Sequence, residues 1–409
     1  MKKTGLFLLC VLFTLTCLWA QAAAPKPEQT KNDATAVSVA VHVLAKKQFV
    51  SDLALQDFEL IENGSPRPVQ ALYLIRKNKI ERSEGTAAPN IPVFRKFYVL
   101  FQLPEYHAKI LPALEYLFKE ELLPGDTLDI QTPIRNYKLT DEAFAKKPKN
   151  VLAKELNDIV KKDIVQGGMA YNSVMQELKR LARRIGGSTR TSLDDVSAEV
   201  DYGDSMGLES QLTQYRSSLQ KMESLRALDE NKMLDFARII KSQEGRKHVF
   251  YVYQREFRPE INAASLNQIM RSNQDRPDIM ANVQDLFQSY NRDLSLNPRR
   301  LREAFADSGA TFNLLYINRQ PERISGINMR EQSEDIFKAF SGIAQATGGL
   351  VDTSANPDSA VKESLKSTDA YYLLCFLPDP GPKTGAFRAL QVRVKNKDYT
   401  VVTRIGYIY

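Results

Sequence analysis

The sequence contains few of the residues that most often carry out catalysis. There are three histidines, three cysteines and one tryptophan among 409 residues. His42, His107 and His248 show no metal-ligand spacing, and the chain has neither a Gly-x-Ser-x-Gly nucleophile motif nor a Gly-x-x-x-x-Gly-Lys-Ser/Thr phosphate loop. We therefore expect a protein that is not an enzyme and needs no cofactor. An enzyme without a recognisable motif, for example one using Glu105 with His107, is the alternative.

The scarcity of cysteine limits how the chain is stabilised. Cys10 and Cys17 lie close to the N-terminus, and the remaining cysteine, Cys375, lies in the apolar run 371–377. Without the first two, no internal disulfide is possible, so stability must come from a hydrophobic core. The composition, 43% hydrophobic and 26% charged, is ordinary for such a core. Cys375 is interpreted as a buried strand residue, with a reactive thiol as the alternative.

Strong charge of one sign is also missing. The net charge is +7, and Lys2 and Lys3 contribute two of these positive charges. Proteins that bind nucleic acid usually gather Lys and Arg on one face, whereas here the bias is weak and spread over a long chain. We therefore expect no nucleic-acid partner.

The N-terminus carries a targeting signal. Lys2 and Lys3 precede an apolar run over residues 6–19, and Ala20-Gln21-Ala22 follows as a small-x-small cleavage site. This pattern predicts a signal peptide over residues 1–22, then a linker over residues 23–35. The protein would be exported to a periplasm or to the extracellular space, with no membrane span after removal of the signal. A retained N-terminal anchor is the alternative, but the run is short for a span.

Both ends of the remaining chain favour β-structure. Residues 36–44 alternate apolar and polar, and Asn63-Gly64 between two apolar runs indicates a hairpin. These features predict an N-terminal β unit over residues 36–80. Three short apolar runs predict C-terminal strands within residues 369–409. Because neither end has enough strands to be stable alone, we expect the two to pack as a small β-sandwich.

The middle of the chain has a different pattern. After a polar linker at residues 81–90, buried strands at 97–101, 128–130, 249–253 and 311–317 alternate with amphipathic helices. This alternation predicts an α/β domain over residues 92–355, with a mainly parallel central sheet wrapped by helices, inserted into the β-sandwich. Helical inserts are expected at 186–241 and 262–297. Gly167-Gly168 is interpreted as a turn between helices at 152–160 and 171–185.

Several short motifs occur in order along the chain. They are Asp57-Phe58-Glu59-Leu60-Ile61-Glu62-Asn63-Gly64 at the start, Gly245-Arg246-Lys247 before a central strand, Ala346-Thr347-Gly348-Gly349 at a helix end, and Arg404-Ile405-Gly406-Tyr407 near the C-terminus. With them, the chain from about residue 37 to 409 resembles the bacterial secreted VWFA-related proteins. The resemblance implies a Rossmann-like von Willebrand factor A (vWA) domain. It also implies a metal-ion-dependent adhesion site, where loops at the carboxyl edge of the sheet supply hard oxygen ligands.

The residues at the expected ligand positions do not suit a divalent cation. The resemblance places an Asp, two Ser, a Thr and a second Asp at positions that this chain fills with Gln102, Pro104, Tyr106, Met169 and Gln254. Methionine is a soft ligand, and Arg255 adds a positive charge nearby. We therefore expect a degenerate site without metal. The alternatives are Glu105 as a remaining ligand, or a metal site in the acidic group Asp194, Asp195, Glu199, Asp201 and Asp204.

A rigid scaffold that presents loops at one edge favours a binding function. Tyr, Met and Arg are enriched at protein interfaces. The candidate partner-binding residues are Glu105, Tyr106, His107, Tyr171, Gln254 and Arg255. We expect a non-enzymatic exported vWA-like protein that mediates metal-independent protein–protein interaction in the cell envelope or outside the cell. The alternative is a structural envelope protein that self-associates through the helical insert 208–241.

Overall fold

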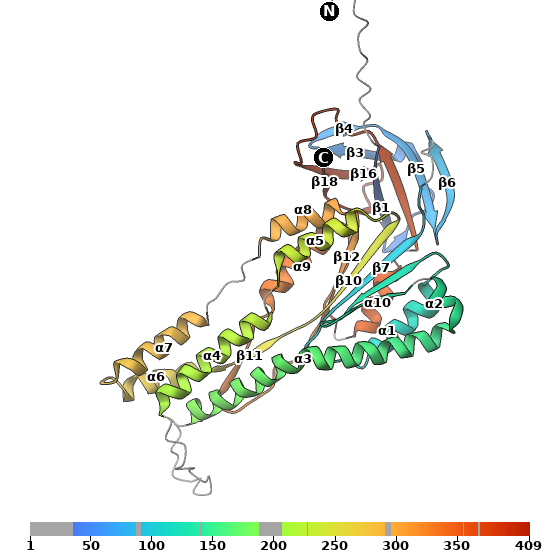
Figure 1. Ribbon diagram of the computed structural model, residues 1–409. Coiled ribbons are helices and arrows are strands. Elements are labelled where there is room, and N and C mark those ends of the chain that lie inside the picture. The colour runs from blue at the N-terminus through green and yellow to red at the C-terminus, as the bar shows by residue number, and fades with distance from the viewer. Residues whose placement is uncertain are drawn as a thin grey trace, which may run out of the picture. The chain divides into compact units, whose positions relative to one another are not determined.

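The computed structural model describes residues 36–86, 91–139, 141–187, 207–226, 228–290, 296–354, 356–366 and 369–409. The expected signal peptide (1–22), the linker (23–35) and the acidic group at 194–204 lie outside these residues. The described chain is a mixed α/β fold with several sheets (Figure 1). Within it, no helix combines the length and the hydropathy needed to cross a bilayer.

One six-stranded sheet forms the centre of the α/β part. Its order is β9-β8-β7-β10-β12-β14, in which β9 runs antiparallel to β8 and the other pairs are parallel. The strands are β7 (Arg95–Gln102), β8 (Thr127–Gln131), β9 (Asn136–Leu139), β10 (Arg246–Gln254), β12 (Thr311–Ile317) and β14 (Val351–Asp352). Along the chain this is the doubly wound order 3-2-1-4-5-6, in which ligands bind beyond the carboxyl ends of the two central strands, here β7 and β10.

Helices cover both faces of this sheet, which explains why its strands are continuous apolar runs. On β7, Phe97 and Val99 pack into the core on one face, whereas Tyr98 and Leu100 pack into the core on the other. The first face is covered by α1 (Ile110–Tyr116), the helical turn η2 (Leu117–Glu121), the first half of α3 (Lys149–Gly187) and α10 (Pro357–Lys366). The second is covered by α5 (Glu230–Lys241), α8 (Pro298–Asp307) and α9 (Glu334–Thr347). The short helix α2 (Asp141–Lys146) precedes α3.

The first and last strands of the chain form two further sheets around a shared core. One sheet contains β1 (Val37–Ala45), β2 (Gln48–Phe49), β5 (Val69–Arg76), β6 (Lys79–Gly85), β15 (Ala370–Phe376) and β17 (Thr400–Thr403). The other contains β3 (Phe58–Glu62), β4 (Ser65–Arg67), β16 (Phe387–Val394) and β18 (Gly406–Ile408), and η1 (Leu55–Asp57) precedes it. Val41, Leu60, Tyr372 and Leu390 belong to one buried cluster between them. Both ends of the chain therefore contribute to both sheets.

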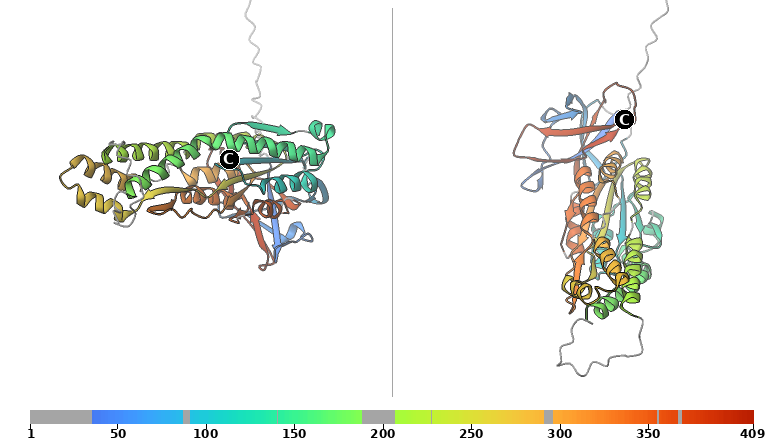
Figure 2. Two further views of the ribbon diagram at one scale, coloured as in Figure 1. Left: turned by 90° about the horizontal axis from the view of Figure 1, so that it is seen from below. Right: turned by 90° about the vertical axis from the view of Figure 1, so that its left-hand side faces the viewer.

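A group of helices extends beyond the carboxyl end of β10. It consists of α4 (Leu208–Arg226), α6 (Ala263–Ser272), α7 (Pro277–Ser289), the second half of α3 and the antiparallel pair β11 (Phe257–Ile261) and β13 (Ile327–Glu331). These elements share a hydrophobic core of their own, and we call them the helical arm (Figures 1 and 2). The arm therefore contains helices α6 and α7 of the predicted insert 262–297 and helix α4 of the predicted insert 186–241.

Three expectations about elements need correction. The predicted helical insert 186–241 does not extend to residue 241, because helix α5 packs on the central sheet. Asp229 begins this separate helix by accepting hydrogen bonds from the backbone N–H groups of Asn231 and Lys232. Residues 81–90 are not all linker, because β6 continues to Gly85 as a polar edge strand on β5. The α/β domain does not end at residue 355, since α10 packs into the same core.

Candidate functional site

The carboxyl ends of β7 and β10 define the crevice where the sequence predicts the functional site. Gln102 ends β7 and pairs in register with Tyr253 of β10. The crevice contains a small hollow of about 60 Å³, whose lining includes Pro104, Glu105, Asn172, Arg255 and Arg319. Of the predicted site residues, Pro104, Glu105, Tyr171 and Arg255 line this hollow, joined by further residues of α3 and by the segment after β12.

The loop after β7 uses its polar atoms within the chain. The Tyr106 hydroxyl donates to Asn157 Oδ1 at 2.6 Å, and the Tyr106 ring packs against the core under α3. Burial raises the pKa of Tyr106. The Pro104 carbonyl accepts a hydrogen bond from Asn172 Nδ2 at 3.1 Å. Both groups are thus directed at α3, and neither stands free as an oxygen ligand.

The pair Gly167-Gly168 is not a turn, because α3 continues through it. A Cβ at Gly168 would lie 2.1 Å from the Pro104 carbonyl oxygen, and one at Gly167 would lie 2.6 Å from Pro133 Cβ. The two glycines therefore allow the helix to approach the loops after β7 and β8 closely. Met169 is 64% exposed and lies outside the lining of the hollow. Instead it borders a shallow groove on α3 with Val165.

The rim of the hollow consists of paired charges. Glu105 Oε2 lies 3.0 Å from Arg319 Nη1, and Glu322 lies 3.4 Å from Arg319 and 2.7 Å from Lys179 Nζ. The hydrogen bond from Lys179 lowers the pKa of Glu322. Arg255 forms an ion pair with Glu331 of β13. The carboxylates at this edge are therefore paired with positive side chains of the same chain.

Two of the predicted contact residues lie beneath this rim. Gln254 is only 7% exposed. The Tyr171 hydroxyl accepts a hydrogen bond from Gln332 Nε2 at 3.3 Å, and its ring packs against the core of the helical arm. Burial raises the pKa of Tyr171. Gln254 is therefore covered within the fold, whereas Tyr171 is half-buried and lines the hollow from the side of the arm.

His107 and Glu105 have separate partners. His107 Nδ1 accepts a hydrogen bond from the backbone N–H of Lys109 at 3.3 Å, whereas the Glu105 carboxylate pairs with Arg319. Burial, assisted by the Lys109 charge, lowers the pKa of His107. Across the described ranges, no group of three His, Cys, Asp or Glu side chains is arranged to hold a metal ion.

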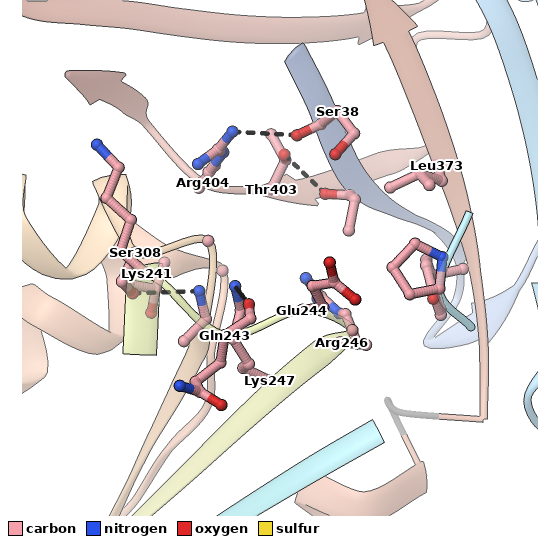
Figure 3. A pocket seen from close by; sticks show the side chains of 18 of the residues that line it. Ser38, Lys241, Gln243, Glu244, Arg246, Lys247, Ser308, Leu373, Thr403 and Arg404 are labelled. Atoms are coloured by element: carbon pink, nitrogen blue, oxygen red, sulfur yellow. Dashed lines mark hydrogen bonds between the residues drawn. The ribbon is translucent and has the colours of Figure 1, made fainter. Parts of the chain in front are cut away.

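A larger cavity, of about 410 Å³, lies at the opposite, amino-terminal edge of the central sheet. Figure 3 shows it between the start of β10 and strands from the two ends of the chain, with Arg246, Lys247 and Arg404 around it. The sequence analysis singled out Gly245-Arg246-Lys247 and Arg404 as motif residues only. Their convergence was not predicted, because they come from segments about 160 residues apart in the chain, as their numbers show.

Comparisons of the chain with protein-family models, with curated proteins and with solved structures find no match. Function is therefore inferred from the residues and their geometry.

Proposed function

We propose that this chain is an exported, non-enzymatic protein with a vWA-like domain inserted into a small β-sandwich, and that it binds a protein partner without a metal ion. The doubly wound strand order supports a Rossmann-like core with a binding edge beyond β7 and β10. The pairing of β1 with β15 and of β3 with β16 supports an insertion between the two ends of the chain. The proposed location is a periplasm or the extracellular space.

The main support for the proposal is the bonding of the side chains at the carboxyl edge of the central sheet. The Tyr106 hydroxyl bonds to Asn157, and Arg255 is paired with Glu331. A divalent cation in proteins takes six or more oxygen ligands if it is Ca²⁺, and near-ideal octahedral oxygens if it is Mg²⁺. Because the side chains at this edge are bonded to one another, they offer the oxygen ligands of neither Ca²⁺ nor Mg²⁺. A partner protein would therefore be contacted by side chains without a metal ion.

An exposed surface beside this edge supports the choice of a protein partner. Val165 and Met169 lie one turn apart on α3 and are 53% and 64% exposed. Lys161, Lys162 and Asp158 border the same groove. Apolar side chains surrounded by charged ones are typical of an interface with a small apolar centre and a polar rim. Glu105 and Arg319 are paired charged residues in the lining of the hollow.

The alternative, self-association through residues 208–241, receives less support. It needs a continuous set of exposed apolar side chains, but Leu212, Tyr215, Leu219 and Met222 of α4 are buried in the core of the helical arm. Leu225 and Ile239 are exposed, at 39% and 59%, but they lie on the separate helices α4 and α5.

The test uses the purified protein to capture its partner from an envelope extract, followed by calorimetry with the purified partner. We expect an unchanged Kd in the presence of EDTA, and at least tenfold weaker binding by Met169→Asp, which corresponds to about 1.4 kcal/mol. Ile239→Asp is the matched control, because Ile239 is also apolar and exposed (59%) but lies on α5. Loss of binding in EDTA, or equal weakening by both variants, would contradict the proposal.

A further inference from the structure

The cavity at the amino-terminal edge of the sheet has the size of a small-molecule site. Its volume of about 410 Å³ falls within the range of ligand pockets. Its walls are partly apolar, with Ile91, Leu373 and Val402 among the lining residues. Positive side chains from β10 and from the segment after β17 face it (Figure 3).

Positive charge exceeds negative charge in the lining. The basic residues are Lys241, Arg246, Lys247 and Arg404, whereas the acidic residues are Glu244 and Asp307. Asp307 is already paired with Lys241 at 2.7 Å. Burial, followed by the charges of Arg246 and Arg404, lowers the pKa of Lys247 to about 8. The cations thus repel one another in surroundings where water screens them poorly.

Two further cations, Lys247 and Arg404, have a structural partner. Helices α5, α8 and α9 end at the cavity, and their terminal carbonyl groups attract positive charge. Lys247 Nζ donates to the Gln243 carbonyl at 3.0 Å, and Arg404 Nη1 donates to the Ala306 carbonyl at 3.2 Å. Arg404 Nη2 also donates to the Ser38 carbonyl. Lys247 and Arg404 therefore cap the helix ends and tie the strands to them.

Arg246 has no comparable partner. Its Nη2 donates to Thr311 Oγ1 at 2.6 Å, and its guanidinium carbon lies 5.3 Å from the centre of the Tyr371 ring. Within the described residues no carboxylate forms an ion pair with it, and its Nε is buried without an acceptor. Arg246 is half-buried, and holding a cation partly out of water without an opposite charge costs free energy. A charged residue in such surroundings marks a candidate contact for a group that the chain does not supply.

We propose that this cavity binds a small organic oxyanion, a molecule with a carboxylate or a phosphate group, and that Arg246 contacts that group. The guanidinium suits both, because its planar donors match carboxylate and phosphate oxygens. Lys247 and Arg404 add positive charge around the anion, and the helix-end carbonyls that would oppose it are already bonded to them. The apolar wall at Leu373 and Val402 accommodates the rest of the molecule. This site is separate from the carboxyl edge and does not depend on the function proposed there.

The test measures the unfolding midpoint and the calorimetric binding of inorganic phosphate and of succinate, with chloride holding the ionic strength constant. We expect one or both oxyanions to raise the midpoint of the wild-type protein in a saturable manner. A response to phosphate alone assigns the site to phosphate compounds, and a response to succinate alone assigns it to carboxylates. Arg246→Met should abolish the response. Arg238→Gln should retain it, because Arg238 is an exposed cation of α5, with its side chain 73% exposed.

The unfolding midpoint of Arg246→Met in chloride, without an oxyanion, shows whether Arg246 serves a ligand or stabilises the fold. If Arg246 serves a ligand, its replacement by Met removes an uncompensated charge, so the midpoint in chloride should equal or exceed that of the wild type. Leu373→Trp fills the cavity while keeping Arg246, and it should also remove the response. The proposal is overturned if neither phosphate nor succinate raises the unfolding midpoint above its value in chloride. It is also overturned if the increase persists in Leu373→Trp and Arg246→Met.

Discussion

Glu62 provides the sharpest test of how the two ends of the chain are joined. Its side chain is 1% exposed, at the end of β3. It accepts hydrogen bonds from Arg67 Nε at 3.0 Å, from Arg388 Nη1 at 3.2 Å, from the Asp379 backbone N–H at 3.0 Å and from the Tyr407 hydroxyl. Three of these donors belong to the C-terminal segment. The substitution Glu62→Gln keeps the size of the side chain but removes its charge and one acceptor atom.

The expected loss follows from the ion pairs. Breaking a fully buried pair costs roughly 3–5 kcal/mol. The side chains of Arg67 and Arg388 are 21% and 12% exposed, so water compensates part of the loss. We therefore expect Glu62→Gln to lower the free energy of unfolding by about 2–3 kcal/mol at neutral pH. The control is Glu59→Gln, because Glu59 lies exposed on the same strand and should change stability by less than about 0.5 kcal/mol.

The assay is urea unfolding followed by circular dichroism over a range of pH. Burial alone would raise the pKa of Glu62, but hydrogen bonds from Tyr407, Asp379 and Arg388 lower it below its ordinary value of 4.5. A carboxylate with a lowered pKa stabilises the fold above the unfolded value, and this stabilisation disappears as the pH falls through the folded value. The difference between wild type and Glu62→Gln should therefore shrink below about pH 4.5. A variant as stable as Glu59→Gln, or a difference independent of pH, would refute the reasoning.

Three further outcomes are expected. Gly168→Ala should lower the free energy of unfolding by roughly 1–3 kcal/mol in urea, because the added methyl group would collide with the Pro104 carbonyl. Gly207→Ala, where nothing lies within 4 Å, should be close to neutral, and equal effects would exclude the close packing of α3 as the cause. Tyr215→Phe should cost about 1–2 kcal/mol, since it removes the buried hydrogen bond to the Pro259 carbonyl; an unchanged urea midpoint would contradict this. EDTA should leave the thermal unfolding midpoint unchanged, and a lower midpoint in EDTA would point to a structural metal.

The sequence predicts best those elements whose hydrophobic pattern is local. The apolar runs 97–101, 249–253 and 311–317 each lie within a strand of the central sheet, because strands covered on both faces need apolar side chains at every position. The alternation of residues 36–44 likewise corresponds to β1, in which Val39, Val41 and Val43 share the buried core. Such patterns show which side chains of a strand are buried, and they do so whichever element covers the strand.

Elements set by tertiary contacts were predicted less well. Gly167-Gly168 suggests a break, but the helix continues because Pro104 and Pro133 approach it, and their position is not visible in the local sequence. The polar strand β6 is held by backbone pairing at a sheet edge, so it lacks a hydrophobic signal. The edge strand β9 does alternate, with Tyr137 and Leu139 against the core, but four residues are too few for a clear pattern. The end of α4 was missed although Asp229 is a typical helix N-cap residue. The boundary between two helices could have been found from that residue.

The candidate site was also predicted only in part, because some of its contacts join segments that are distant in the sequence. The loops after β7 and β10 meet as the strand order requires, so Glu105 and Arg255 lie at one hollow. Their partners Arg319 and Glu331 belong to segments after β12, which the sequence did not connect with the edge.

The central claim is that the carboxyl edge binds no divalent cation and leaves recognition to side chains. The most direct measurement is a crystal structure of the protein grown in the presence of magnesium or calcium. We predict no ordered cation beside Gln102 and Gln254, and an ion pair between Arg255 and Glu331 that persists. A cation coordinated by oxygen atoms between the ends of β7 and β10 would contradict the claim.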